Sequence, residues 1–339
     1  MLSPSFLIVG VIITATFLAV RPAAGADEAI TNEQPKTAYL AAYFTEKKGR
    51  NGQEDSELYY AIARDGFRFA DDVNHGGPVL AATVNDKLTR DPMLMRDSDG
   101  KSFHLIATVS WKGRSLVLFD SKDLVRWTNE RLVQVAPTNA DMTWAPELRW
   151  DPETKQYFAY WTSSVSNTWD TAAIWYATST DLKTFSQPKV LMREAKGCLD
   201  ADIIHARGKW HMVYRYVGIW MRTADHAFGP YENPVKILDL DVEGPFMFPV
   251  NRTTNQWGLV FDYFGGNQGR WGMATSSDFV NWSLVTHKDW PYYMPDVFFP
   301  SGVRHGSVLP ITDQEANRIL KAFGSTPFDY KGHKPKQEL

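Results

Sequence analysis

The sequence predicts an all-β protein that forms a single five-bladed β-propeller, with a composite closing blade built from N- and C-terminal segments. Two observations lead to this prediction. One short motif recurs at roughly even intervals, and the stretches between its copies read as groups of four short strands. The chain has 339 residues, 44% of them hydrophobic, which is sufficient for one large domain.

The recurring motif is clearest as Ser-Lys-Asp-Leu-Val-Arg-Trp at residues 121–127. Close copies lie at 179–185 and 276–282, and weaker copies lie at 63–69 and 223–228. The aspartates fall at positions 65, 123, 181, 225 and 278, so consecutive copies are 58, 58, 44 and 53 residues apart. We expect each copy to form the turn between the third and fourth strands, where Asp accepts backbone hydrogen bonds and the aromatic residue folds back over the blade. The motif is therefore structural.

The blades follow from this spacing. In the first, β-rich segments lie at 93–95, 103–109, 116–120 and 132–135, so the first four blades span 91–135, 144–191, 199–238 and 243–285. The fifth takes its inner strand from 303–311 and the rest from 38–44, 58–63 and a strand near Val79, which closes the ring and removes open edges. The catalytic domain would then span 36–312. In 313–339, a capping box from Thr312 to Glu315 predicts a short helix ending at Phe323, and a polar tail follows.

The first 26 residues have the features of a signal peptide. Residues 6–20 are nearly all apolar, Arg21-Pro22 ends the run, and the small residues 24–26 provide a cleavage site. No Lys or Arg precedes the run, so an uncleaved anchor is the alternative. We expect a secreted protein, extracellular or periplasmic, without membrane contact after cleavage.

Composition narrows the function classes. The formal net charge is −3, with acids and bases mixed throughout, and no basic stretch indicates nucleic-acid binding. The single cysteine, Cys198, excludes an internal disulfide and reads as a small buried residue. Aromatic residues make up 14% of the chain, which fits either sugar stacking or ordinary use in a large β protein.

Acidic residues recur where the blades begin. The starts read Arg90-Asp91-Pro92, Trp144-Ala145-Pro146-Glu147, Leu199-Asp200-Ala201-Asp202, Glu243-Gly244-Pro245 and Arg304-His305-Gly306. The first strand of each propeller blade lines the central channel, so these side chains converge. Like charges in a confined site raise each other's pKa. Glycoside hydrolysis needs such an arrangement, with one carboxylic acid protonated and one carboxylate ionised. A calcium-binding channel is the structural alternative.

The order of these five motifs resembles glycoside hydrolase family 43 over residues 38–312. The resemblance implies Asp91 as general base, Asp200 as the acid that orients and tunes its neighbour, and Glu243 as general acid. It also implies that His305 lies near the channel centre, where family members often hold calcium through waters. In most members the base lies near the mature N-terminus, whereas here residues 38–89 precede Arg90 and are assigned to the fifth blade.

Several residues keep two interpretations. Asp200 competes with Asp202, because residues two apart on a strand share a face, and the resemblance favours Asp200. Glu147 binds sugar hydroxyls or caps a turn, and Trp144 is a stacking platform or a core residue. His305 belongs to a metal shell or is simply hydrogen-bonded. Arg270 reaches into the pocket or is a solvated surface residue.

The resemblance implies an enzyme that hydrolyses O-glycosyl bonds in a carbohydrate substrate, of the α-L-arabinofuranosidase or β-xylosidase type and with inversion. A β-D-galactofuranosidase of the same fold is the alternative sugar specificity. A retaining fructosidase-type propeller would need an acidic nucleophile near the N-terminus, and residues 38–44 contain no acid. A non-catalytic carbohydrate-binding propeller is the alternative from another class.

Overall fold

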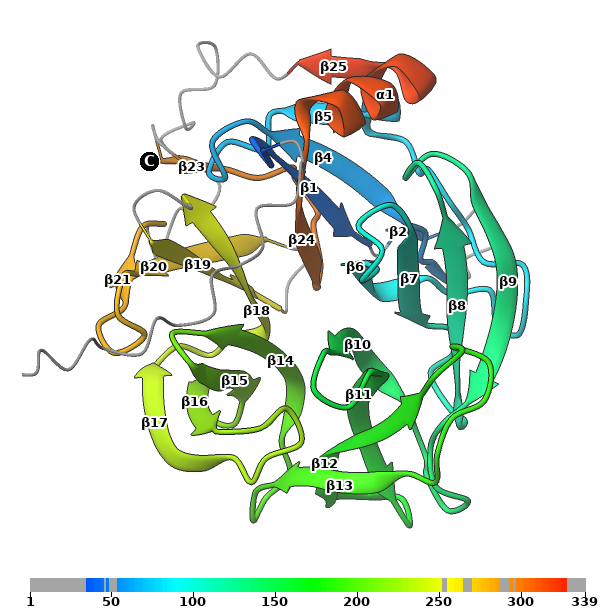
Figure 1. Cartoon of the computed structure of the whole chain (residues 1–339), viewed down its shortest axis with the longest axis vertical. Helices are drawn as coiled ribbons and strands as arrows, with labels where there is room; N and C mark the ends of the chain where they lie inside the picture. Colours follow the sequence, from blue (N-terminus) through cyan, green and yellow to red (C-terminus); the bar gives the residue numbers. More distant parts are fainter. Residues whose placement is uncertain are drawn as a thin grey trace, which may run out of the picture. The chain divides into compact units, whose positions relative to one another are not determined.

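The computed structural model describes residues 35–45, 47–48, 54–251, 255–264, 270–286, 293–294 and 297–327. Within them, five sheets of four or five strands are arranged in a ring, each with its first strand toward the centre (Figure 1). The predicted five-bladed propeller is therefore confirmed. The predicted signal peptide at 1–26 and the polar tail at 331–339 lie outside the described residues.

The first four blades each contain four strands that follow one another along the chain and pair antiparallel. Blade 1 consists of β6 (Arg90–Arg96), β7 (Phe103–Thr108), β8 (Ser115–Ser121) and β9 (Trp127–Gln134). Blade 2 consists of β10 (Trp144–Asp151), β11 (Gln156–Val165), β12 (Thr168–Ser179) and β13 (Lys189–Arg193). Blade 3 consists of β14 (Leu199–Ala206), β15 (Lys209–Arg215), β16 (Ile219–Ala224) and β17 (Glu232–Leu238). Blade 4 consists of β18 (Glu243–Asn251), β19 (Gln256–Asp262), β20 (Trp271–Ser276) and β21 (Ser283–Leu284).

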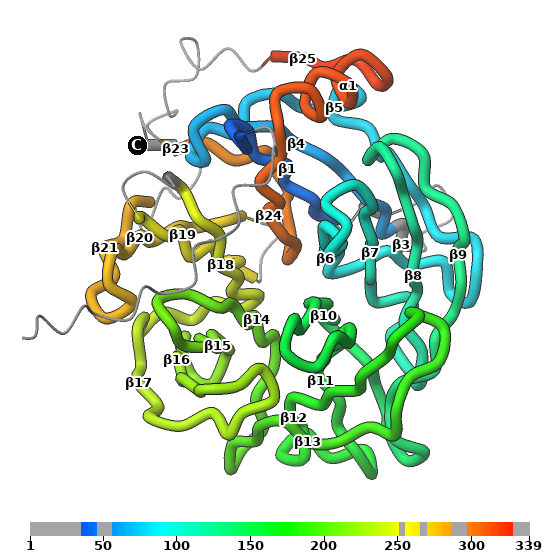
Figure 2. The backbone as a smooth tube through the Cα atoms, viewed as in Figure 1, coloured from blue at the N-terminus to red at the C-terminus, as the bar shows by residue number. Residues whose placement is uncertain are grey.

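The fifth blade joins the two ends of the folded region, as predicted. Its strand order is β24 (Gly306–Ile311), β1 (Ala38–Tyr43), β4 (Tyr59–Ala63), β5 (Asp71–Val73) and β25 (Ser325–Pro327). Figure 2 shows the blue and orange-red segments side by side, and β1 pairs with β24 along its whole length. The predicted strand near Val79 is wrong, because β5 takes the fourth place and Leu80 makes only an isolated bridge to Leu58.

The predicted helix is α1 (Asp313–Phe323), and both hydrogen bonds of the capping box between Thr312 and Glu315 are present. The remaining elements are a short 3-10 turn at Asn74–Gly76 and two small hairpins, β2 (Lys47–Lys48) with β3 (Glu54–Asp55) and β22 (Tyr293–Met294) with β23 (Val297–Phe298). No helix among the described residues is long and apolar enough to cross a membrane.

The repeated motif forms the expected turn. Asp123 Oδ1 accepts hydrogen bonds from the N–H groups of Val125 and Arg126. Asp181 and Asp278 repeat these two bonds in blades 2 and 4, and Asp65 does so in blade 5. The aromatic residue behaves differently from the prediction, because Trp127 Nε1 donates to the Tyr60 hydroxyl of the neighbouring blade at 3.1 Å. The motif thus shapes its own turn and also packs one blade against the next.

Five apolar clusters of buried residues fill the interfaces between neighbouring blades. One joins blades 5 and 1, one joins blades 1 and 2, and the others continue around the ring. Trp161 and Trp271 are the largest of the fully buried side chains. Burial of apolar area stabilises a fold by about 25 cal/mol per Å². The five clusters therefore hold neighbouring blades together and keep their inner strands around the centre.

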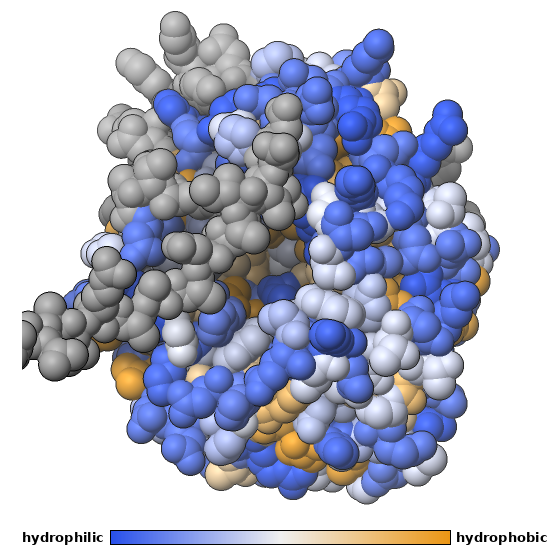
Figure 3. All heavy atoms as spheres, viewed as in Figure 1, coloured by the Kyte–Doolittle hydropathy of each residue, from blue (hydrophilic) through white to orange (hydrophobic). Residues whose placement is uncertain are grey.

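Cavities lie at two depths along the inner strands. One cavity of about 220 Å³ is lined by residues from the strand starts. Another, of about 300 Å³, is lined by residues farther along the same strands, including Met95, Ile204 and Leu309. Figure 3 shows one face of the propeller, with a hollow at the centre of the ring where both hydrophilic and hydrophobic residues are visible.

Candidate active site

Each of the first four inner strands begins with the same backbone irregularity. Pairing with the second strand shifts register between Arg90 and Met93, Trp144 and Glu147, Leu199 and Asp202, and Glu243 and Phe246. The second residue of each bulge has a left-handed backbone, with φ of 49° at Asp91, 47° at Ala145, 53° at Asp200 and 58° at Gly244. Pro or Ala follows it in every case. A bulge changes the direction in which a side chain points, and these four bulges all lie at the start of an inner strand.

The bulge sorts the predicted acids into two layers. Asp91 and Asp200 occupy its second position, and Glu243 occupies its first. All three line the 220 Å³ cavity. Glu147 and Asp202 occupy the fourth position and are not among the lining residues. The expectation that Asp200 and Asp202 lie on the same face of the strand is therefore wrong, because the bulge interrupts the two-residue period.

In a bulge, the N–H of the second residue does not pair with the neighbouring strand. Here a side-chain oxygen of the preceding blade accepts a hydrogen bond from it. Thr108 Oγ1 accepts from Ala145 N at 3.0 Å, and Thr162 Oγ1 accepts from Asp200 N at 3.0 Å. For Gly244 N the acceptor is the Asp200 carboxylate itself, also at 3.0 Å. Asp200 is thus bonded directly to the backbone beside Glu243.

His305 lies against this ring of acids. Its Nδ1 is 3.6 Å from Asp91 Oδ1, and Asp91 Oδ2 accepts a hydrogen bond from the Thr108 hydroxyl at 2.8 Å. A Cβ atom on Gly244 would lie 2.7 Å from the His305 ring, so only glycine permits this approach. Burial alone would lower the pKa of His305, but Asp91 and Asp200 raise it to about 9. Burial likewise opposes the ionised form of Asp91, but His305 lowers its pKa to about 2.

Glu243 has the opposite electrostatic environment. Burial and the charges of Asp200 and Asp262 raise its pKa to about 7, against the opposing effects of Arg304 and His305. Arg304 Nη2 donates to Glu243 Oε1 at 2.9 Å, and Arg304 Nε donates to the fully buried Asp262 at 2.6 Å. Arg304 thus contacts Asp262 through Nε and Glu243 through Nη2, and this pair of contacts fixes the position of the acid.

The pKa of Asp200 is also raised, first by burial and also by Asp91. His305 and the bond from Gly244 N act in the other direction. Asp200 and Glu243 thus have raised pKa values and lie beside Asp91, whose pKa is lowered.

The deeper layer forms a buried ion cluster below the cavity. Arg149 Nη2 lies within ion-pair distance of both Glu147 and Asp202, and Asp202 also accepts from Met247 N at 2.6 Å. Burial raises the pKa of Glu147 despite Arg149. Glu147 therefore contacts protein groups, and its predicted contact with a sugar stays a prediction.

Of the other predicted binding residues, Trp144 and His305 line the cavity, whereas Arg270 does not. Five lining residues had no predicted role: Arg90, Thr108, Trp111, Leu199 and Arg304. Arg90, Leu199 and Arg304 stand directly before a predicted site residue, which was an available signal. Thr108 and Trp111 come from the second strand and the loop after it, which no motif marked.

The donor atoms around His305 bear on the predicted calcium site. Among the described residues, no group of three or more His, Cys, Asp or Glu side chains is arranged to hold a metal ion. A His305 ring with a raised pKa carries a proton at neutral pH and cannot offer that nitrogen to a cation. The side chains of this centre do not fit direct calcium coordination.

Comparison with known proteins agrees with the fold. A family described as "Probable glycosyl hydrolase domain", related to glycoside hydrolase family 43, matches residues 34–317. The chain belongs to this family, and it is a glycosidase of the family 43 type.

An α-L-arabinofuranosidase of Bifidobacterium longum subsp. longum is 25% identical over 213 residues, which cover 53% of this chain. The match spans 20% of the length of that relative. The fold is shared with a thermostable family 43 glycoside hydrolase (TM-score 0.51, 15% identity, 63% of this chain and 76% of the other). It is also shared with the α-L-arabinofuranosidase PaAbf62A of Podospora anserina (TM-score 0.51, 15% identity, 66% and 76%).

Proposed function

We propose that this chain hydrolyses α-L-arabinofuranoside or β-D-xyloside linkages in the side chains of plant or microbial polysaccharides, with inversion. The observation that supports this most is the separation of two pKa values within one cavity. The pKa of Asp91 is lowered to about 2, and that of Glu243 is raised to about 7. Two carboxyl groups that differ in this way are suited to act as base and acid at the same pH.

Glu243 is the proposed general acid. Protonated near neutrality, it would donate its proton to the oxygen of the leaving group as the glycosidic bond breaks. The carboxylate that forms would be stabilised by Arg304, whose Nη2 already lies 2.9 Å from it. Asp200 would keep the proton on Glu243 before the reaction, because its negative charge disfavours ionisation.

Asp91 is the proposed general base. Ionised at any working pH, it would orient a water molecule and accept its proton as the water attacks the anomeric carbon. Asp91 belongs to blade 1 and Glu243 to blade 4. Two steps around a five-membered ring favour the wider separation, roughly 6.5–9.5 Å, that leaves room for this water.

The function is tested with nitrophenyl α-L-arabinofuranoside, β-D-xyloside and β-D-galactofuranoside. We expect hydrolysis of one of the first two, with only a partial loss of that rate in Glu243→Gln, because a nitrophenyl leaving group needs little protonation. Activity on the galactofuranoside alone would assign the alternative specificity. Oligosaccharide binding without any hydrolysis would make the chain a non-catalytic carbohydrate-binding propeller. Proton NMR of the first product would decide between inversion and retention.

Export is a further part of the proposal, supported by the apolar run at 6–20 and the small residues at 24–26. N-terminal sequencing of the protein from the culture medium or periplasm should begin near residue 27. An intact N-terminus in the membrane fraction would indicate an uncleaved anchor.

Calcium near His305 stays a prediction, and no catalytic step depends on it here. Since the described side chains do not fit direct coordination, any ion would have to be held through waters. Elemental analysis and activity after exhaustive chelation test it.

A further inference from the structure

Trp111 is an exposed aromatic side chain at the rim of the cavity. It is 44% exposed and yet belongs to the lining residues, together with Asp91, Asp200 and Glu243. The acids lie deeper, with side-chain exposures of 13% for Asp91 and 23% for Glu243. A large apolar side chain exposed beside a polar cavity indicates a binding surface.

The indole is fixed before any ligand arrives. The Arg90 guanidinium lies 4.1 Å from the centre of the Trp111 ring. The same guanidinium lies 4.4 Å from the centre of the Phe44 ring. The Trp144 ring meets Trp111 edge-on, with 5.6 Å between the ring centres. Such cation–π and edge-to-face contacts define one orientation of the ring.

The loop that carries Trp111 is fixed as well. Trp144 Nε1 donates to Trp111 O at 3.1 Å, Thr143 Oγ1 donates to Gly113 O at 2.8 Å, and Gly113 N donates to Asp141 O at 3.1 Å. The loop between β7 and β8 is thereby tied to the segment that leads into blade 2. A surface ordered in advance loses little conformational entropy when it binds.

The cavity itself limits what can lie beside the acids. Its volume is about 220 Å³. Sites for drug-sized ligands occupy about 300–1,000 Å³, so this one accommodates roughly one sugar ring. A second ring of the same substrate must lie outside, on the rim, where Trp111 presents its exposed surface.

We propose that Trp111 is the platform of an acceptor subsite, which stacks against the sugar ring that leaves when the bond to the terminal residue is cleaved. The C–H bonds on a sugar face are complementary to the electron-rich face of an indole. The enzyme would accordingly remove single terminal residues from an oligosaccharide or polysaccharide. This inference rests on the proposed function of the cavity.

The test compares two substrates with the same terminal sugar, a methyl glycoside and an oligosaccharide. The methyl group gives the platform nothing to stack against, whereas a nitrophenyl group would stack on it. We expect Trp111→Ala to lower kcat/KM on the oligosaccharide about tenfold and on the methyl glycoside by less than about twofold. Trp111→Phe should restore most of the loss.

Trp169→Ala is the matched control, because Trp169 is 45% exposed and does not line the cavity. It should leave both substrates unchanged. Equal losses on both substrates in Trp111→Ala would overturn the proposal and place Trp111 at the terminal residue or in support of Arg90. Unchanged rates on both would overturn it as well.

Oligosaccharide binding, followed by quenching of tryptophan fluorescence, separates this inference from the proposed function. If the wild type hydrolyses none of the substrates but binds the oligosaccharide, and Trp111→Ala weakens that binding about tenfold, the platform stands and the catalytic proposal fails. If the wild type hydrolyses the oligosaccharide and Trp111→Ala binds it as tightly, the platform fails alone.

Discussion

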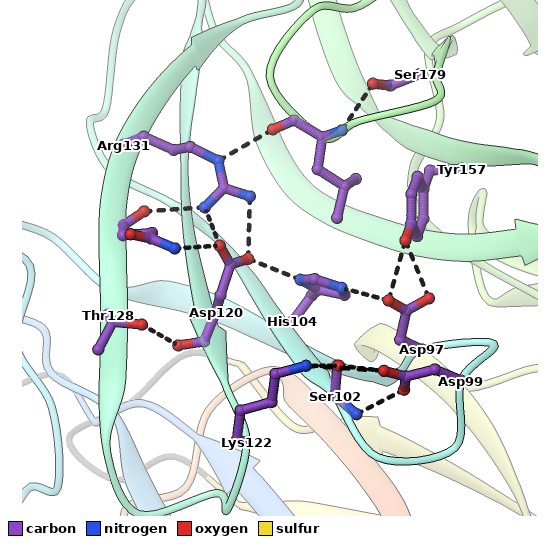
Figure 4. A network of polar contacts seen from close by, with 12 residues as sticks. Asp97, Asp99, Ser102, His104, Asp120, Lys122, Thr128, Arg131, Tyr157 and Ser179 are labelled. Carbon is purple, nitrogen blue, oxygen red and sulfur yellow. Dashed lines mark hydrogen bonds and ion pairs between the residues drawn. The ribbon is translucent and has the colours of Figure 1, made fainter.

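In two regions of this propeller, a histidine lies beside two carboxylates. The regions differ in how many hydrogen bonds from protein groups those carboxylates already accept. In the outer region, His104 lies between Asp120 at 2.7 Å and Asp97 at 3.2 Å (Figure 4). At the channel, His305 lies against Asp91 and its pKa is raised by Asp91 and Asp200. Both imidazoles have raised pKa values for the same reason.

The acids of the outer region are occupied by protein groups. Asp120 also receives two hydrogen bonds from Arg131 and one from Asn129, and Asp97 receives the Tyr157 hydroxyl at 3.0 Å. Arg131 in turn donates to the Leu182 carbonyl of the next blade. This network therefore joins blades 1 and 2 and leaves little capacity for a ligand.

The acids of the channel line a cavity and have fewer contacts among the described residues. Asp200 accepts a hydrogen bond from Gly244 N, Asp91 accepts one from the Thr108 hydroxyl, and Glu243 accepts one from Arg304. The comparison indicates that a charged cluster is structural when its oxygens are saturated from several sides, and functional when its remaining oxygens meet an open volume.

The largest effect should come from Glu243→Gln, which removes the proposed acid from the channel. We expect the rate on unactivated glycosides to fall by several orders of magnitude, with a milder loss for good leaving groups, which need less protonation. Steady-state rates on a series of leaving groups provide the measurement. Equal losses across the series would mean that Glu243 is not the acid. Its role would then be structural, like that of Asp97 and Asp120 in the outer region.

Next in size is Asp200→Asn. Removal of its negative charge should lower the pKa of Glu243, so the acid would lose its proton at lower pH and the basic limb of the pH–rate profile would move downward. Asp202→Asn is the matched control in the deeper layer and should not move that limb. A shift in the control alone would mean that the wrong aspartate was chosen.

The outer network should affect stability and its dependence on pH. The pKa of His104 is raised above 6.5 in the folded protein by Asp120 and Asp97, although burial opposes this. Its contribution is therefore complete below about pH 6.5 and is lost as the pH rises through the folded value. His104→Gln should lower the melting temperature clearly at pH 6 and less at pH 9.

His226→Gln provides the control, since its exposed pair with Glu153 should matter little. Activity per folded molecule should stay unchanged in His104→Gln. Equal destabilisation at both pH values would show that shape, and not the charge between Asp97 and Asp120, gives His104 its role.

The sequence predicted the ring and most of its strands because the turn motif and the two-residue alternation are local signals. It placed Asp91, Asp200 and Glu243 together correctly around one cavity. It could not separate Asp200 from Asp202, because the bulge that divides them depends on pairing between β14 and β15. Likewise, Arg304 and Asp262 meet only when blades 4 and 5 close the ring, so no single segment contains that contact.

The strand near Val79 was misplaced for a related reason. Residues 71–73 are mostly acidic, Asp71-Asp72-Val73, and do not look like a strand. They pair with β4 on one side and with β25 on the other, and the second partner comes from the far end of the chain. An element held by two distant partners has little local signal.

The smallest predicted effect concerns the repeated turns. Their aspartates are the same residue type as the aspartates of the channel but have a structural role. Asp123 Oδ1 accepts two backbone N–H groups of its own turn, and Asp123 lines neither of the two cavities described above, so Asp123→Asn retains the oxygen acceptor and loses only the charge. A net loss well under 1 kcal/mol is expected, seen as a fall of about 2 °C or less in melting temperature, with unchanged activity. Asp123→Ala should cost more, because both N–H groups lose their acceptor. A drop in activity per folded molecule in either variant would mean that the turns act on the channel through the blades, and the distinction between saturated and open acids would no longer separate structure from function.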